Sequence, residues 1–351
     1  GMDSDSYVKM LNMIWEKIID IHSVLVIRNG YMLLDAYSYP FDSEIPHHID
    51  SCTQSISSSL VGIGIDKGYI KDISQPVLDF FPARVAKNLD VNKNSMTLEN
   101  LLTMTTGLEC RDPFLYLQSG MMDMIIPAEW RMSKDWVQFI IDLPMAETPG
   151  SRYQYCNGAP FLLSAILQEQ TGMNALTFAE KHLFEPLGIS EVGWPSNPQG
   201  ITLGYGHLFM RPHDMAKIGY LYLKSGWWDG KQIISSQWIY ESTRKYIDTT
   251  LLPGYGYHWW IASSDVYTAA GNKGQYIMVA PDKNIVAVFT GRLSPRNFLI
   301  PLDLLAQYII PAVKSPNALP ENTIVNKALK SKIALWQNTN SSDNNRSKRK
   351  N

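Results

Sequence analysis

Ser51 and Gln54 stand one helical turn apart at the start of residues 50–68, a segment whose apolar residues recur at helical spacing. The first turn of a helix presents unpaired backbone N–H groups and the positive end of the helix dipole, and both favour developing negative charge. A serine in that place can serve as a nucleophile, and Gln54 lies on the same helical face. Gly68 suits the left-handed position after a helix end, so we predict a single helix here.

The same two residues have an ordinary structural interpretation. Ser-x-x-Gln at a helix start is the capping-box pattern, in which the serine caps the third amide and the glutamine reaches back. On Ser51 and Gln54 alone we favour the capping box over a catalytic serine, because such patterns are common at helix starts. The case for chemistry therefore depends on the rest of the chain.

Bulk properties exclude several classes of protein. The 351 residues suffice for one large domain or two smaller ones, and 45% hydrophobic with 18% charged residues is typical of a globular chain. A net charge of −2 argues against a nucleic-acid partner, and the absence of a long apolar run argues against a membrane span. Gly1 ahead of Met2 is typical of a tag remnant. A periplasmic or extracellular location after removal of a signal peptide, and a cytoplasmic location, therefore both stay open.

Cysteine and histidine spacing gives no sign of a disulfide framework or a metal site. Cys52, Cys110 and Cys156 are scattered and include no Cys-x-x-Cys pair. We predict that Cys52 and Cys156 are small buried hydrophobic residues. The seven histidines show no ligand spacing, and no phosphate-binding glycine loop is present, so we expect neither a metal nor a cofactor.

Hydrophobic periodicity predicts strands near both ends of the chain and helices between them. Residues 5–20 form an amphipathic helix pattern, and residues 22–37 read as a hairpin around an Asn-Gly turn. Residues 72–250 contain mainly helical segments and loops, whereas residues 255–290 are rich in β-forming residues. Residues 297–313 are predicted to be a closing helix.

This order of elements predicts an α+β fold, in which an antiparallel sheet flanked by helices receives an inserted, mainly helical lobe. Residues 5–71 and 251–314 would form the sheet lobe, and residues 72–250 the helical lobe. Residues 315–351 would be a C-terminal tail whose Asn-, Ser- and Lys-rich end is predicted to be disordered.

Three stretches in order carry a resemblance to a known family: Ser51-Cys52-Thr53-Gln54, Tyr155-Cys156-Asn157 and Gly271-Asn272-Lys273-Gly274-Gln275. Their order and spacing resemble the penicillin-recognising serine hydrolases, which include AmpC-type β-lactamases, DD-peptidases, and esterase and nylon-oligomer-hydrolase relatives. Segments such as LENLLTMTTGLE, PGSRYQYCNGAPFLLSAILQEQTG and GNKGQYIMVAPDKNIVAVFTG look like recurrent segments of that family. The resemblance covers roughly residues 20–312 and implies a β-lactamase/transpeptidase-like fold.

The resemblance also implies roles for single residues. Ser51 would be the nucleophile that the substrate acylates, and Tyr155 would be the base that relays protons. The side-chain amide of Asn157 would hold a substrate carbonyl. These roles describe hydrolysis of an ester or amide through an acyl-enzyme.

The third stretch would line the cleft on an edge strand. Asn272, Gly274 and Gln275 are expected to contact substrate there. The backbone N–H groups of Ser51 and Gln275 would form the oxyanion hole of such an enzyme, with the register at Gln275 set to within about one residue.

Gln54 departs from the family pattern, which has lysine at this position. Glutamine carries no charge and exchanges no proton at neutral pH, so the pKa of Tyr155 should rise. Acylation should then slow by the factor of about 10² to 10⁴ that is typical of a lost general base. Lys273 could supply a substitute cation near Tyr155, or it could point to solvent from a hairpin.

Two functional hypotheses follow. The first is a serine hydrolase that acts on a small-molecule ester, amide or peptide-like substrate, with Ser51, Tyr155, Gln54 and Lys273 at its catalytic centre. The second is a catalytically impaired homologue that binds a ligand, or is slowly acylated by it, without turnover. Gln54 favours the second hypothesis, and the intact Tyr155 and Asn157 favour the first.

Overall fold

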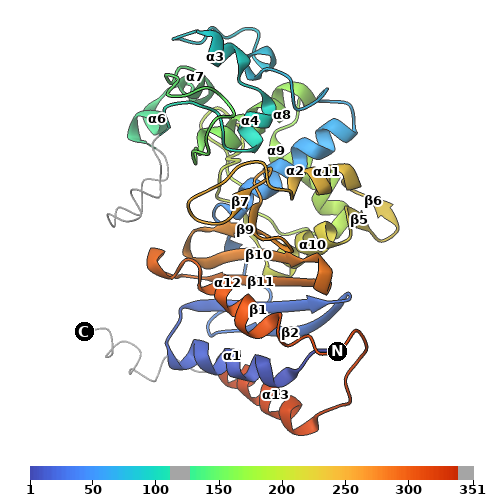
Figure 1. Ribbon diagram of the computed structural model, residues 1–351. Coiled ribbons are helices and arrows are strands. Elements are labelled where there is room, and N and C mark those ends of the chain that lie inside the picture. Colours follow the sequence, from blue (N-terminus) through green and yellow to red (C-terminus); the bar gives the residue numbers. More distant parts are fainter. Residues whose placement is uncertain (111–126, 339–351) are drawn as a thin grey trace, which may run out of the picture. The chain divides into compact units, whose positions relative to one another are not determined.

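The computed structural model describes residues 1–110 and 127–338. The chain forms two compact units, each assembled from stretches that are separate in sequence (Figure 1). Unit 1 consists of Gly1–His47, Met210–Leu223 and Gly271–Asn351, and unit 2 consists of His48–Phe209 and Lys224–Ala270.

Unit 1 contains four antiparallel strands in the order β2-β1-β11-β10. Asn29 and Gly30, with φ of 52° and 82°, form the tight turn between β1 and β2, which confirms the predicted hairpin. β1 from the start of the chain pairs with β11 near its end, as the sequence predicted for the sheet. The strands are β1 (Ile21–Arg28), β2 (Tyr31–Tyr37), β10 (Gln275–Ala280) and β11 (Ile285–Gly291).

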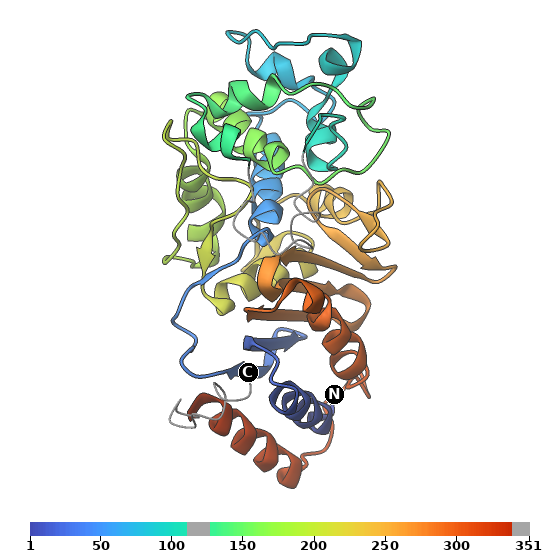
Figure 2. The same cartoon turned by 90° about the vertical axis from the view of Figure 1, so that its left-hand side faces the viewer.

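Helices cover both faces of this sheet, which explains why β1, β10 and β11 are buried along nearly their whole length. α10 packs on β10 and β11, while α1 and α13 lie side by side (Figures 1 and 2). The helices of unit 1 are α1 (Ser4–Glu16), α10 (Pro212–Leu223), α12 (Ile300–Leu304) and α13 (Thr323–Asn338).

α13 is a helix that the sequence prediction missed, because residues 315–351 were assigned to a tail. Leu329 and Trp336 are buried on its inner face, and the backbone N–H of Tyr39 donates to the carbonyl of Trp336 at 3.1 Å. A polar helix with a narrow apolar stripe gives a weak sequence signal, and packing on α1 and β2 stabilises it. The predicted disordered end, residues 339–351, lies outside the described residues.

Unit 2 is mainly helical around two buried helices, α2 and α8. Three antiparallel strands, β7, β8 and β9, complete it. The helices are α2 (Cys52–Asp66), α3 (Val91–Ser95), α4 (Leu98–Leu102), α6 (Ala128–Met132), α7 (Trp136–Ile141), α8 (Gly158–Thr171), α9 (Ala175–Ala179) and α11 (Ser236–Ser242); these three strands are β7 (Gly254–Tyr255), β8 (Trp260–Ser263) and β9 (Val266–Gly271). The short strands β3 (His47–His48) with β4 (Phe209–Met210), and β5 (Trp227–Trp228) with β6 (Lys231–Gln232), form two further ladders.

α2 is buried from Cys52 to Gly64 although four of its residues are serines with modest helix propensity. Two hydroxyl groups connect it to its surroundings: Ser55 donates to the carbonyl of His258 at 2.6 Å, and Ser57 donates to that of Gly204 at 2.8 Å. A third, that of Ser59, donates within the helix to the carbonyl of Ser55 at 2.8 Å. Tertiary hydrogen bonds and burial, rather than local propensity, therefore hold this helix.

The α+β class and the β-lactamase-like architecture predicted from the sequence are confirmed. The division into units differs from the predicted lobes in several elements. α2, β7 and β8, and β9 up to Ala270, belong to unit 2, although they were predicted in the sheet lobe. α10, from the middle of the chain, and α13, from the predicted tail, belong to unit 1.

Candidate active site

Ser51 occupies the N-cap position of α2, directly before the first helical residue. Its side chain makes no capping hydrogen bond within the described part of the chain, so the capping box that Ser51 and Gln54 allow is not formed. Gln54 is 2% exposed and directs its amide elsewhere. Both side chains are thus available to the site at this end of the helix.

Ser51, Gln54 and Tyr155 form a connected hydrogen-bond network in unit 2. The hydroxyl of Tyr155 donates to Ser51 Oγ at 2.8 Å, and Gln54 Nε2 donates to the hydroxyl of Tyr155. Gln54 Nε2 also lies 3.2 Å from Asn157 Oδ1 and 3.2 Å from the carbonyl oxygen of Tyr205. The structure therefore brings together four of the residues predicted for the site.

Three oxygen acceptors converge on the single nitrogen of Gln54: the Tyr155 hydroxyl, Asn157 Oδ1 and the Tyr205 carbonyl. An amide nitrogen has two hydrogens, so Gln54 serves at most two of these acceptors at one time. An ammonium group has three hydrogens and would match the set. The three acceptors around Gln54 are therefore arranged as they would be around a buried ammonium group. The residue at this position, however, is an uncharged glutamine.

Tyr155 is buried, and burial is the main reason that its pKa is raised above the ordinary value of a phenol. The hydrogen bonds that Tyr155 makes with Ser51 and Gln54 lower its pKa, while the neighbouring Asp50 and Cys52 raise it. The phenol is therefore protonated at neutral pH and donates its proton to Ser51 Oγ. A base has to be deprotonated, so the protonated phenol is not in the form that accepts a proton.

Asn157 enters the site from the start of α8, where it occupies the N-cap position. The residue before it, Cys156, forms a disulfide with Cys110. The prediction that Cys156 is simply a buried thiol was therefore wrong. The two cysteines are 46 residues apart in sequence, and their Cα atoms lie 5.5 Å apart. The fold brings them together, so their spacing in the sequence does not reveal the pair. Cys52 is a buried thiol outside the disulfide, as predicted.

A second layer of polar groups supports the network, and sequence reasoning missed it. His48 Nδ1 lies 3.2 Å from the buried carboxylate of Asp50, and His48 Nε2 lies 3.1 Å from His207 Nδ1. Asp50 has φ of 49°, a left-handed conformation that aspartate tolerates better than most residues. Spacing shows no metal-ligand pattern for either histidine. His48 reaches Asp50 from two residues away, whereas its contact with His207 joins residues that are 159 apart and depends on tertiary structure.

A family model described as Beta-lactamase matches residues 22–304. The chain belongs to the Beta-lactamase family. In the pattern of that family set out above, a lysine stands where this chain has Gln54, and lysine is the residue that would supply three hydrogens to the three acceptors.

Curated relatives align with part of the chain. A 6-aminohexanoate-dimer hydrolase of Paenarthrobacter ureafaciens is 23% identical over 221 residues, which are 61% of this chain and 55% of the relative. A beta-lactamase of Escherichia coli strain K12 is 24% identical over 174 residues, 48% of this chain and 41% of that one. The chain thus spans about half the length of the curated relatives it matches.

Solved structures extend the likeness to most of the fold. The octameric penicillin-binding protein homologue from Pyrococcus abyssi superposes with a TM-score of 0.69 at 19% identity, covering 86% of this chain and 77% of the homologue. At this identity the match shows a common fold. It confirms the architecture that the resemblance implied.

The third stretch of the family pattern lies in unit 1, in the turn before β10. Lys273 adopts φ of 62°, and its backbone N–H donates to Asn272 Oδ1 at 2.8 Å. Gly274, with φ of 91°, packs so closely on Leu293 that an added Cβ would lie 2.7 Å from a methyl group. Gln275 Nε2 donates to the carbonyl of Gly291 at 2.7 Å, which braces β10 against β11. The roles of this turn in oxyanion binding and charge supply stay predictions.

Within residues 1–110 and 127–338, the structure contains no group of three or more potential metal ligands. Over the same residues, no helix has the length and apolar character needed to cross a bilayer.

Proposed function

We propose that this member of the Beta-lactamase family is a serine hydrolase that cleaves an ester or amide through an acyl-enzyme at Ser51. The observation that carries the proposal is the 2.8 Å contact between the Tyr155 hydroxyl and Ser51 Oγ at the start of α2. The side chain of Asn157 is joined to the same network through Gln54. Two curated relatives are named 6-aminohexanoate-dimer hydrolase and beta-lactamase, and both names support a hydrolytic reaction.

In the proposed reaction, Ser51 Oγ attacks the substrate carbonyl carbon as its proton passes to the phenolate of Tyr155. The phenol then protonates the leaving alcohol or amine, and the C–O or C–N bond breaks to leave an acyl ester on Ser51. Water attacks that ester by the reverse sequence and releases a carboxylic acid. The step needs Tyr155 in its deprotonated form, and the burial of its side chain disfavours that form at neutral pH.

The second candidate function is ligand binding, or slow acylation, without turnover. It is favoured by the uncharged amide of Gln54 beside Tyr155, and by the phenol proton that points at Ser51 Oγ. A site in this state can accept an activated acyl group slowly and then hold it, because deacylation needs the same base. The two candidate functions use the same residues, and they differ in the rates of acylation and deacylation of Ser51.

Time-resolved intact-mass measurement separates the candidates. Wild-type protein and Ser51→Ala are each mixed with an activated short-chain ester and with a penicillin, and sampled from seconds to hours. An adduct that requires Ser51, forms and decays supports the hydrolase. An adduct that persists supports the binder. Folded protein that gives no adduct with either probe contradicts acylation of Ser51 by these substrates.

Lys273 is proposed as a substitute source of positive charge for Tyr155. Lys273→Gln should lower the rate of adduct formation about tenfold or more if the ammonium group stabilises the phenolate. Lys224→Gln is the matched control, because it removes the same charge from another partly exposed lysine. Equal rates for the two variants would contradict the substitute-cation role and leave Ser51 acylation itself intact.

A further inference from the structure

A buried carboxylate stands directly before the candidate nucleophile. Asp50 precedes Ser51 in the sequence and is 5% exposed. Its carboxylate oxygen lies 3.2 Å from His48 Nδ1. A buried charge is costly unless a neighbouring group offsets it. The state of the His48 imidazole therefore decides how much of the negative charge of Asp50 acts on the residues around it.

The charge of Asp50 acts on the base proposed for Ser51. Burial is the main reason that the pKa of Tyr155 is raised, and the negative charge of Asp50 raises it further. A like charge nearby disfavours the phenolate, which is the form of Tyr155 that accepts the serine proton. Asp50 therefore opposes acylation when its charge is not offset, and the side chain of Gln54 carries no charge that would offset it.

Hydrogen-bond geometry assigns the protons of His48 and of its partner His207. An ionised carboxylate only accepts, so His48 Nδ1 carries a hydrogen and donates it to Asp50. His48 Nε2 lies 3.1 Å from His207 Nδ1, so one proton lies between these two nitrogens. A further proton on His207 Nε2 leaves both hydrogen bonds in place. The imidazole pair can thus take up one positive charge without rearrangement.

Asp50 is the charged group that faces this imidazole pair. The rings packed on the pair are a phenyl and a phenol: the centroid of Phe209 lies 5.1 Å from that of His48, and the centroid of Tyr205 lies 5.6 Å from that of His207. Burial is the main reason that the pKa of His207 is lowered, and His48 lowers it as well, whereas Asp50 raises it. The carboxylate therefore favours the charged form of the pair.

Hydrogen bonds fix these groups against the start of α2. The backbone N–H of Ile49 donates to the carbonyl of Leu208 at 2.9 Å, and the N–H of Leu208 donates to Thr53 Oγ1 at 3.4 Å. Thr53 Oγ1 in turn donates to the carbonyl of Asp50 at 2.6 Å. The carboxylate is therefore held in one place beside Ser51.

We propose that Asp50, His48 and His207, here called the Asp50 cluster, control the charge next to Ser51, with the proton on the imidazole pair offsetting the carboxylate in place of the absent lysine. The two histidines act through Asp50, so they are positioning residues. The proposal rests on the proposed function, because it concerns the acylation of Ser51. It predicts that loss of the carboxylate accelerates acylation, and that loss of the imidazoles slows acylation at acidic pH.

The first test measures acylation of Ser51 by an activated ester at about pH 8.5, where imidazole groups are neutral. Asp50→Asn should raise the rate about threefold or more, because it removes the like charge that opposes the phenolate. Asparagine tolerates the left-handed conformation of this position. Asp79→Asn, at an exposed position of the same unit, is the matched control. Damage to the fold would lower the rate, so an acceleration reports the charge.

The second test compares acylation rates at about pH 6 and about pH 8.5, after subtraction of the Ser51→Ala background. The double variant His48→Gln, His207→Gln takes up no proton, so it should be about threefold or more slower than the wild type at the lower pH and equal to it at the higher pH. His182→Gln, at a partly exposed position, is the control. Equal rates for Asp50→Asn and Asp79→Asn, or the same deficit of the double variant at both pH values, would overturn the proposal.

Histidine NMR on Ser51→Ala, which cannot be acylated, reads the charge coupling without a reaction. We expect His48 and His207 to take up one proton in a single step. Asp50→Asn in this background should move that step to lower pH, because Asp50 raises the pKa of His207. Two independent steps, or a step that Asp50→Asn does not move, would contradict the Asp50 cluster.

These outcomes are distinguishable from failure of the proposed function. A Ser51 adduct in the wild type, together with no acceleration in Asp50→Asn, leaves the hydrolase standing and removes the control of its charge by the Asp50 cluster. A single histidine step that Asp50→Asn moves, together with no adduct from any probe, supports the coupling within the cluster but removes both the acyl-enzyme and its control.

Discussion

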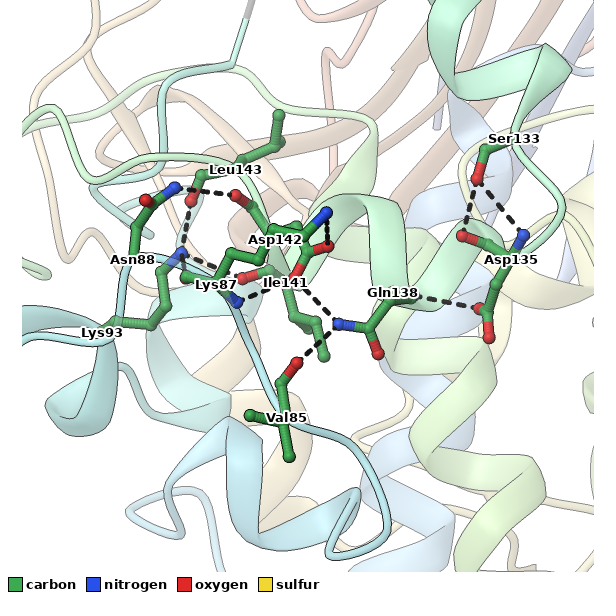
Figure 3. Close-up of polar contacts among 10 residues, drawn as sticks. All are labelled: Val85, Lys87, Asn88, Lys93, Ser133, Asp135, Gln138, Ile141, Asp142 and Leu143. Carbon is green, nitrogen blue, oxygen red and sulfur yellow. Dashed lines mark hydrogen bonds and ion pairs between the residues drawn. The ribbon is translucent and has the colours of Figure 1, made fainter.

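Two buried nitrogen groups of unit 2 face the same kind of surroundings and differ in charge. The ammonium group of Lys93 donates to three carbonyl oxygens, those of Lys87, Ile141 and Leu143, and the residue is fully buried (Figure 3). The amide nitrogen of Gln54 faces three oxygens as well, with one hydrogen too few. At Lys93 the number of hydrogens equals the number of acceptors, and at Gln54 it does not.

The comparison teaches that the candidate active site places the three acceptors of a cation site around an uncharged side chain. Lys93 shows that this fold can bury an ammonium group when three oxygens are placed around it, even though burial lowers its pKa. The loss of charge at Gln54 is therefore a property of one side chain and not of its surroundings. Four predictions test this conclusion.

The largest effect is expected from Gln54→Lys. An ammonium group at this position has three hydrogens for three acceptors and lowers the pKa of Tyr155, so acylation of Ser51 should accelerate about 10²-fold or more. The measurement is the rate of adduct formation with an activated ester. Gln54→Met, which has a similar length and no donor, is the control, and it should be no faster than the wild type. An unchanged rate in Gln54→Lys would show that a lysine at this position does not activate Tyr155, in contrast to the family pattern.

Removal of the donor should cost more at Lys93 than at Gln54. Lys93→Met leaves three buried carbonyls without their charged donor and should lower the free energy of unfolding by about 3 kcal/mol. Gln54→Met removes a neutral donor and should cost about 1 to 2 kcal/mol. Urea denaturation measures both, and Lys134→Met, at an exposed position, should stay within about 0.5 kcal/mol of the wild type. Equal losses of unfolding free energy in Lys93→Met and Gln54→Met would contradict the conclusion that the charged donor matters more than the neutral one.

The pH dependence of the acylation rate should reveal that no positive charge at Gln54 lowers the pKa of Tyr155. Tyr155 acts as a base when it is deprotonated, and its raised pKa keeps that form scarce at neutral pH. The deprotonated fraction grows about tenfold for each pH unit below the pKa, so the wild-type rate should rise about a hundredfold between about pH 7 and pH 9. Gln54→Lys should shift the rise to lower pH. A flat wild-type profile, after subtraction of the Ser51→Ala background, would argue that Tyr155 is not the base.

The smallest effect is expected from Lys93→Gln, which is the reverse exchange. An amide at this position keeps two of the three hydrogens and loses the charge, so it should lower the free energy of unfolding by about 1 kcal/mol, less than Lys93→Met does. Thermal and urea unfolding measure the difference. If Lys93→Gln were as damaging as Lys93→Met, then charge, rather than the number of hydrogens, would decide the stability of such a site.

Sequence reasoning predicted the fold through local signals that the structure keeps. The Asn29-Gly30 turn needs two left-handed residues, so its hairpin is visible in the sequence. α13 was missed because its stability comes from packing on α1. The Cys110–Cys156 disulfide was missed because two distant cysteines show their pairing only once the chain has folded.

The sequence by itself determined which groups this site can use. Ser51, Gln54, Tyr155 and Asn157 were identified from residue type and order, and the absence of charge at Gln54 is already fixed there, because charge belongs to the side chain. Tertiary structure alone decided how that amide is used. It placed the Tyr205 carbonyl beside Gln54, directed the Tyr155 proton toward Ser51, and left the capping box unformed. Hydrogen-bond direction and burial depend on neighbours that are far away in sequence, and only the folded chain brings them together.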